Sequence, residues 1–127
     1  MESRETIRLL QSRKSMRVFE EREIPETVKQ EILSASIRAA SAGNMALYTI
    51  IDVMDARLKR KLSVTCDNQP FIAEAPLVLI YCADYRRWYS AFCEVVNEVR
   101  HPSCGVFMLA AEGAVIAAQT AATAADA

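Results

Sequence analysis

Histidine, glycine and proline are scarce in this sequence: its 127 residues include one His, three Gly and four Pro. The single histidine, His101, and four scattered cysteines lack the spacing of a zinc site, so no metal is expected. No two cysteines form a C-x-x-C pair. There is also no G-x-G-x-x-G motif, the usual signature of a Rossmann dinucleotide site.

A large charge of one sign is also missing. The formal net charge of −1 removes the usual reason to expect nucleic acid or a membrane surface as a partner, although local basic clusters remain. Hydrophobic residues make up 52% of the chain and charged residues 24%, which is typical of a globular protein rather than a disordered one. The length predicts one domain, residues 1–127, with a hydrophobic core.

The first residues lack the apolar core of a secretory signal peptide, because Glu2, Arg4 and Glu5 lie there. We therefore expect a cytoplasmic protein with reduced thiols. The cysteines are expected to be buried as small hydrophobic residues, Cys82 above all, because it belongs to an apolar run.

The stretch Val106–Ala127 contains no Lys or Arg and is dominated by alanine, which raises the alternative of a membrane span. Glu112, Gln119 and Asp126 interrupt it, and alanine contributes little to insertion, so burial within protein is favoured. Its uncharged surface of small residues would allow close helix packing. We expect a homodimer built largely on residues 105–127.

Hydrophobic periodicity predicts helices that alternate with strands, and hence an α+β fold with a mixed β-sheet flanked by helices. Asp55 is expected to cap a helix. The unbroken apolar run Leu77–Cys82 is typical of a central strand with both faces covered. The last helix has no C-terminal stop signal, so the chain is expected to end within it. Helices are expected near residues 6–10, 25–40, 57–62, 84–99 and from about 105 onward, and strands at residues 48–53 and 77–82.

Three cations and a hydroxyl gather within five residues, Arg13-Lys14-Ser15-Met16-Arg17. Arg supplies forked donors, Lys a point charge and Ser a further donor, so this segment could hold a phosphate. If the backbone is extended, Arg13, Ser15 and Arg17 lie on one face of it. The alternative is a solvated basic loop that follows a helix.

Together with Val18-Phe19, this segment resembles the Arg-Arg/His-Ser-x-Arg/Lys-x-Phe signature that opens the nitroreductase family. Three later segments are similar to motifs of that family in the same order, so the chain resembles the family's N-terminal portion, cut off in its long central helix. They are the loop Ala39–Met45, the Gln-containing loop Asn68–Pro76 that leads into the apolar strand, and the helix start Gly113–Gln119.

The resemblance implies an FMN-dependent oxidoreductase that passes electrons from NAD(P)H through the flavin to a nitroaromatic, quinone or similar small acceptor. Arg13 and Ser15 match residues that grip the ribityl phosphate of FMN, with Lys14 beside them. Arg17 matches a cation near the pyrimidine edge of the flavin, where it would stabilise the negative charge of the reduced ring. No catalytic acid–base pair is expected, because the chemistry belongs to the cofactor.

Ser41 and Asn44 match residues that, in this family, approach the flavin from the second subunit of the dimer. Asn68 and Gln69 fall where side-chain amides meet the flavin ring or its ribityl chain, and the sequence does not decide between them.

The sequence departs from the family at Met45-Ala46-Leu47, where a Gln-Pro or similar pair is usual, so the acceptor stays open. The family also continues past the central helix into a Gly-rich turn, further strands and a basic residue that completes the phosphate site. The alternative function is therefore a non-catalytic, truncated relative that binds flavin weakly or only associates with a partner chain. A third reading is a reductive dehalogenase or a flavin-destructing relative.

Overall fold

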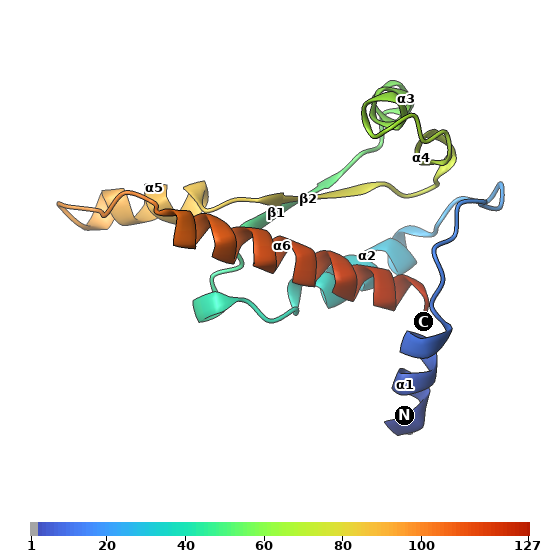
Figure 1. Ribbon diagram of the computed structural model, residues 1–127, viewed down its shortest axis with the longest axis horizontal. Coiled ribbons are helices and arrows are strands. Elements are labelled where there is room, and N and C mark those ends of the chain that lie inside the picture. Colours follow the sequence, from blue (N-terminus) through green and yellow to red (C-terminus); the bar gives the residue numbers. More distant parts are fainter. Residues whose placement is uncertain (1–2) are drawn as a thin grey trace.

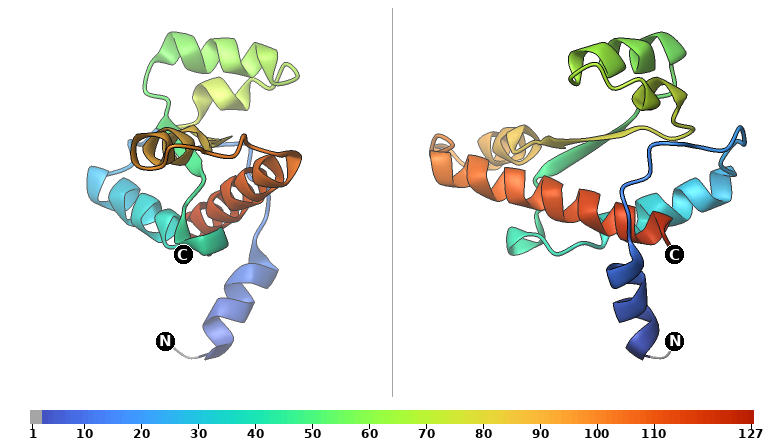
Figure 2. Two further views of the ribbon diagram at one scale, coloured as in Figure 1. Left: turned by 90° about the vertical axis from the view of Figure 1, so that its left-hand side faces the viewer. Right: turned by 45° about the vertical axis from the view of Figure 1, so that its right-hand side comes forward.

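The structure, a computed structural model, describes residues 3–127 and has the α+β character that the sequence predicts. The elements in chain order are α1 (Ser3–Ser12), α2 (Glu26–Ile37), the 3-10 helix η1 (Ala42–Asn44), β1 (Tyr48–Asp52), α3 (Ala56–Thr65), α4 (Phe71–Glu74), β2 (Leu79–Ala83), α5 (Arg86–Val95) and α6 (Cys104–Ala125). Helices α2 and α6 lie on one side of a short pair of strands and α3 and α4 on the other, and the N-terminal helix projects away from the rest of the chain (Figures 1 and 2).

The two strands pair antiparallel, with Tyr48 opposite Ala83 and Asp52 opposite Leu79. Within residues 3–127 this is the whole sheet, so no parallel pair is present there to make it mixed. The prediction that the apolar run is covered on both faces is not met. The residues of β2 are half-buried or exposed, because β1 is its only strand neighbour in the described part of the chain.

Helix α6 packs across the strand pair and against α2 (Figure 1). The residues that it buries are small and recur every three or four positions, which is the spacing of one helix face. Small side chains let the helix backbone lie close to the ring of Tyr48, which belongs to the buried core with Ala114 and Ala117. The buried positions are Ala110, Gly113, Ala114, Ala117 and Ala121.

One buried hydroxyl joins three elements. Ser36 of α2 is fully buried, and its Oγ donates to the carbonyl of Ala117 in α6 at 3.0 Å. Since that hydroxyl proton is used, the hydroxyl of Tyr81 in β2 donates to Ser36 Oγ, also at 3.0 Å. The relay Tyr81–Ser36–Ala117 therefore fixes α2, β2 and α6 relative to one another.

Most predicted elements are confirmed, with shifted ends. Asp55 caps α3 as predicted, accepting from the backbone N–H of Arg57 at 2.7 Å. The predicted helix 84–99 begins later, because Asp84 accepts from the backbone N–H of Arg86 and acts as a cap. The short helix α4 lies where the sequence predicts a loop. Burial of the cysteines is wrong for three of them and only partly met by the fourth: Cys66, Cys93 and Cys104 are exposed and Cys82 is half-buried.

The apolar helix α6 is long and apolar enough to cross a membrane by length and composition alone, a test that the core helix of a soluble protein also passes. Its burial within the protein is one-sided, since 28% of its most apolar window is buried. The outward side exposes large apolar residues, namely Phe107, Met108, Leu109, Val115 and Ile116.

Replacing Ser36 with Ala should lower the free energy of unfolding by about 1–3 kcal/mol, because the hydroxyl of the half-buried Tyr81 and the Ala117 carbonyl both lose their partner. Urea unfolding followed by circular dichroism measures this. The matched variant Tyr81→Phe removes only one of the two bonds and should cost less. Equal stability of Ser36→Ala and the unaltered chain would show that the relay does not hold the three elements.

Replacing Gly113 with Ala should raise the free energy of unfolding by about 0.5–1 kcal/mol, because glycine is unfavourable in a helix interior. A Cβ built on Gly113 meets the Tyr48 ring at 3.6 Å, an ordinary contact distance, so the space is sufficient. The same urea titration tests it. A destabilised variant would mean that α6 needs the absence of a side chain at this position.

Candidate functional site

The basic segment, residues 13–17, lies exposed and outside regular secondary structure between α1 and α2. The backbone N–H of Arg13 closes α1 by donating to the Leu9 carbonyl at 3.1 Å, so helical structure stops as the basic side chains begin. Among residues 3–127, none of the ion pairs uses Arg13, Lys14 or Arg17. Their charges are therefore available to an anion.

Arg17 connects the basic segment to a distant part of the chain. Its guanidinium lies over the ring of Phe71, 5.6 Å from the centroid, a cation–π contact. Phe71 opens α4 directly after the turn that carries Asn68 and Gln69. The structure thus brings Arg17 next to the helix that these two amides precede. Phe71 belongs to the loop Asn68–Pro76 that matches the family motif, but the sequence assigned it no role, because its contact with Arg17 joins segments far apart in the chain.

The turn before α4 is held in left-handed backbone conformations. Asp67 has φ of 64° and Asn68 has φ of 52°, a region that Asn and Asp tolerate better than most residues. Gln69 is half-buried, and its side-chain Nε2 donates to the Cys66 carbonyl at 2.8 Å. Asn68 is exposed. The two amides therefore differ: that of Gln69 already bonds to the turn, whereas that of Asn68 faces solvent.

Ser41 and Asn44 lie elsewhere, around η1. This helix and α4 are on opposite sides of the strand pair in every view (Figures 1 and 2). One copy of the chain therefore does not bring all the predicted site residues together. The half-buried Ser41 accepts at Oγ from the backbone N–H of Ala46 at 3.1 Å, whereas Asn44 is exposed. That they act on a flavin held by a second subunit stays a prediction.

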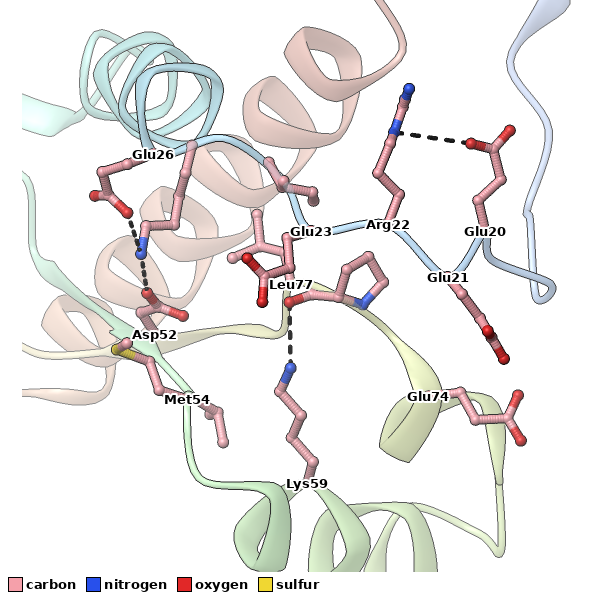
Figure 3. A pocket seen from close by; sticks show the side chains of 14 residues that line it. Glu20, Glu21, Arg22, Glu23, Glu26, Asp52, Met54, Lys59, Glu74 and Leu77 are labelled. Carbon is pink, nitrogen blue, oxygen red and sulfur yellow. Dashed lines mark hydrogen bonds and ion pairs between the residues drawn. The ribbon is translucent and has the colours of Figure 1, made fainter.

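A hollow of about 530 Å³ lies between residues 20–24, α2 and α3, and Figure 3 shows the side chains that line it. Lys29 Nζ lies 2.9 Å from carboxylate oxygens of both Glu26 and Asp52. The hydrogen bond to Asp52 is the largest cause that raises the pKa of Lys29, and the hydrogen bond to Glu26 is the next. Lys59 Nζ donates to the Ala75 and Pro76 carbonyls. The charged lining consists of Glu20, Glu21, Glu23, Glu26, Asp52 and Glu74 against Arg22, Lys29 and Lys59.

This surplus of carboxylates repels a phosphate, and none of the predicted site residues lines the hollow. The hollow is therefore not the predicted cofactor site. In the described part of the chain, no three His, Cys, Asp or Glu side chains gather as metal ligands.

The aromatic residues of α5 line a separate, apolar pocket of about 290 Å³. Trp88 and Phe92 lie with their ring centroids 5.8 Å apart, and Met45 and Leu47 face the same pocket from the loop after η1. His101 is exposed and stacks on Tyr89, with ring centroids 6.3 Å apart.

Comparison with known proteins places this geometry in a family. No protein-family model matches the chain. It is 35% identical over 85 residues to an NADH dehydrogenase of Thermus thermophilus, covering 67% of this chain and 42% of that protein. It is 32% identical over 83 residues to an FMN reductase [NAD(P)H] of Bacillus subtilis, covering 65% of this chain and 33% of that protein.

Among solved structures, the NfrA1 nitroreductase from B. subtilis superposes with a TM-score of 0.89 at 27% identity, over 95% of this chain and 50% of the other. The resemblance to the nitroreductase family is confirmed, and the chain has that family's fold. This nitroreductase-like chain spans half the length of that solved relative and less than half of the two curated ones.

Asp84 ties the loop after η1 to the strand pair. Its carboxylate accepts from Thr49 Oγ1 at 2.6 Å and from the backbone N–H of Arg86 at 3.0 Å, and its own N–H donates to the Leu47 carbonyl at 2.9 Å. The Thr49 hydrogen bond is the largest cause that lowers the pKa of Asp84. A lowered folded-state pKa contributes stability above the unfolded value of about 3.9, and this is lost as the pH falls through the folded pKa.

Replacing Thr49 with Val should raise the pKa of Asp84 toward its usual value, since the main donor to the ionised carboxylate is removed. An NMR titration of the Asp84 carboxyl carbon measures the shift. Acid unfolding should begin at a higher pH in the variant than in the unaltered chain. A pKa that does not move would remove Thr49 as its cause.

Proposed function

We propose that this nitroreductase-like chain binds FMN as part of an NAD(P)H-dependent oxidoreductase that reduces a nitroaromatic, quinone or similar small acceptor. The observation that carries the proposal is the exposed segment 13–17, whose cations make no ion pair within residues 3–127 and whose Arg17 reaches α4. The B. subtilis relative is an FMN reductase [NAD(P)H], and it supports the same cofactor and electron donor.

The donor set fits the groups of FMN. A phosphate is bound well by forked guanidinium donors, a lysine charge and a hydroxyl, which Arg13, Lys14 and Ser15 supply on an exposed segment. A polar ring edge is bound by a cation and amides, which Arg17, Asn68 and Gln69 supply around α4. The acidic hollow of about 530 Å³ offers neither.

When bound, FMN would supply the hydride-transfer chemistry between NAD(P)H and the acceptor. The residues of this chain bind and orient it: Arg13 and Ser15 hold the phosphate with Lys14 beside them. Arg17 supplies a fixed positive charge where negative charge gathers on reduction, which favours the reduced state. No side chain is assigned a proton transfer.

The proposed assembly is a homodimer in the cytoplasm. The outward side of α6 exposes Phe107, Val115 and Ile116, and apolar residues of this size exposed along one helix are typical of an interface. A second copy packed there would bring a second η1 loop into the assembly. Ser41 and Asn44 of that loop then approach the flavin of the first copy.

A second candidate is a chain that associates with a partner without retaining FMN. It is favoured by β2, which pairs only with β1 in the described part of the chain and so leaves its other edge open to a further strand. An absorption spectrum of the purified chain, taken after adding FMN and desalting, separates the two candidates. Flavin retained near one per chain supports the first, and none retained supports the second.

Replacing Arg13 or Ser15 with Ala should weaken FMN binding by about 1–3 kcal/mol, the cost of a lost hydrogen bond to a charged group. Quenching of flavin fluorescence on titration measures the affinity. Arg22→Ala is the matched control, since Arg22 is an exposed arginine that lies 3.8 Å from Glu20 outside the segment. Loss of affinity in all three variants alike would point to general charge rather than to a phosphate site.

Replacing Arg17 with Ala should lower the reduction potential of the bound flavin, because the charge that stabilises the reduced ring is removed. Replacing it with Lys keeps the charge and should retain most of the potential. Equilibration with a reference dye measures both. An unchanged potential in Arg17→Ala would remove the electrostatic role assigned to this residue.

A further inference from the structure

We propose that Arg87 and Trp88 are positioning residues that hold the loop of Ser41 and Asn44 in the conformation that meets the flavin. This inference rests on the proposed function and adds roles for two residues of α5 that match none of the family motifs in the sequence. The loop comprises residues 41–47.

This loop stores conformational strain. Gly43, Asn44 and Ala46 have φ values of 57°, 56° and 46°, all in the left-handed region. Glycine adopts it freely and asparagine tolerates it, but alanine pays about 1–2 kcal/mol because its Cβ approaches the following carbonyl. A residue of this kind persists only where its surroundings hold it. Something must therefore hold Ala46.

Three consecutive carbonyls of the loop are held by the segment that starts α5. The Met45 carbonyl accepts from Trp88 Nε1 at 2.5 Å, and the Ala46 carbonyl accepts from Arg87 Nη2 at 2.8 Å. The Leu47 carbonyl accepts from the backbone N–H of Asp84 at 2.9 Å. The Ala46 carbonyl also accepts from the backbone N–H of Tyr48 at 2.7 Å, which tightens the same bend.

The other side of the loop is closed by the loop itself. The backbone N–H of Ala46 donates to Ser41 Oγ at 3.1 Å, so both polar groups of the strained residue are bonded. Ser41 thereby links the strained residue to η1 and to Asn44. Loss of a hydrogen bond at the Ala46 carbonyl would therefore shift the side chains of Ser41 and Asn44, which the proposed function uses.

The hydrogen bonds of Arg87 and Trp88 to the loop form a clamp, and this clamp is anchored to the strand pair. Thr49 of β1 holds the carboxylate of Asp84, and this carboxylate caps the first turn of α5, where Arg87 and Trp88 lie. Arg87 makes no ion pair among residues 3–127, so its charge-assisted hydrogen bond to the loop is its principal polar contact. Arg87 is itself exposed, so the hydrogen bond to the Ala46 carbonyl is what fixes the position of its guanidinium.

The test compares three substitutions in α5. Arg87→Met keeps the stem and removes the donor, and Trp88→Phe keeps an aromatic ring and removes the N–H. Arg86→Met is the matched control, because Arg86 lies in the same turn, is exposed like Arg87, and makes no side-chain hydrogen bond in the described part of the chain. We expect FMN binding about tenfold weaker in the first two variants and unchanged in the control.

A merely structural role is separated from a positioning role by rescue and by a double-mutant cycle. Ala46→Gly removes the strain that the clamp offsets, so Arg87→Met with Ala46→Gly should recover FMN affinity toward the unaltered value. Combined with Asn44→Ala, Arg87→Met should cost less than the sum of the two single changes, because both act through one contact. Failure of rescue together with additive costs would overturn the proposal.

Hydrogen exchange measured without FMN tests the clamp independently of the proposed function. Trp88 is the only tryptophan, so its indole N–H gives one NMR resonance, and the hydrogen bond to Met45 should protect it from exchange. Arg87→Met should speed exchange of the Ala46 amide. Fast exchange of both protons in the unaltered chain would overturn the clamp. If both are protected but no FMN is retained, the proposed function fails and the clamp stands.

Discussion

The buried relay Tyr81–Ser36–Ala117 is the interaction on which the arrangement of this chain depends. A buried hydroxyl must find its partners, and here the partners come from β2 and α6, so only one sliding position of α6 across the strands satisfies all three groups. Small residues on α6 would by themselves allow several positions. The polar relay therefore selects among packings that apolar burial leaves nearly equal, and it fixes the place of Tyr48 at the start of β1.

Two groups of polar side chains lie at opposite ends of this strand pair. At one end, Asp84 connects the strands to α5 and to the loop of Ser41 and Asn44. At the other end, Lys59 of α3 donates to the carbonyls that precede β2, next to the helix that Arg17 contacts. Because the strand pair separates these groups, a complete flavin site on the proposed plan needs two copies, and the exposed apolar side of α6 offers a surface for their association.

Local signals in the sequence predicted much of this fold. The cap at Asp55, both strands and the long apolar helix depend on neighbours within a turn or two, and periodicity reports such neighbours. What the sequence did not predict depends on distant contacts. The left-handed Ala46 is held by residues 41 positions away, and the cation–π contact of Arg17 joins segments that no pattern relates. The motifs identified the residue types of the candidate site, and the resemblance already set Ser41 and Asn44 apart from the rest, but neither predicted the contacts that hold these residues in place.

The net charge of −1 conceals a sharp division of charge along the chain. The cations of residues 13–17 are exposed, and the carboxylates that follow, from Glu20 to Glu26, turn into the acidic hollow with Asp52 and Glu74 (Figure 3). An anion approaching this face is attracted by one segment and repelled by the next. The carboxylates thus do more than balance the charge: on the proposed function, they confine a phosphate to the segment whose Arg17 already reaches α4.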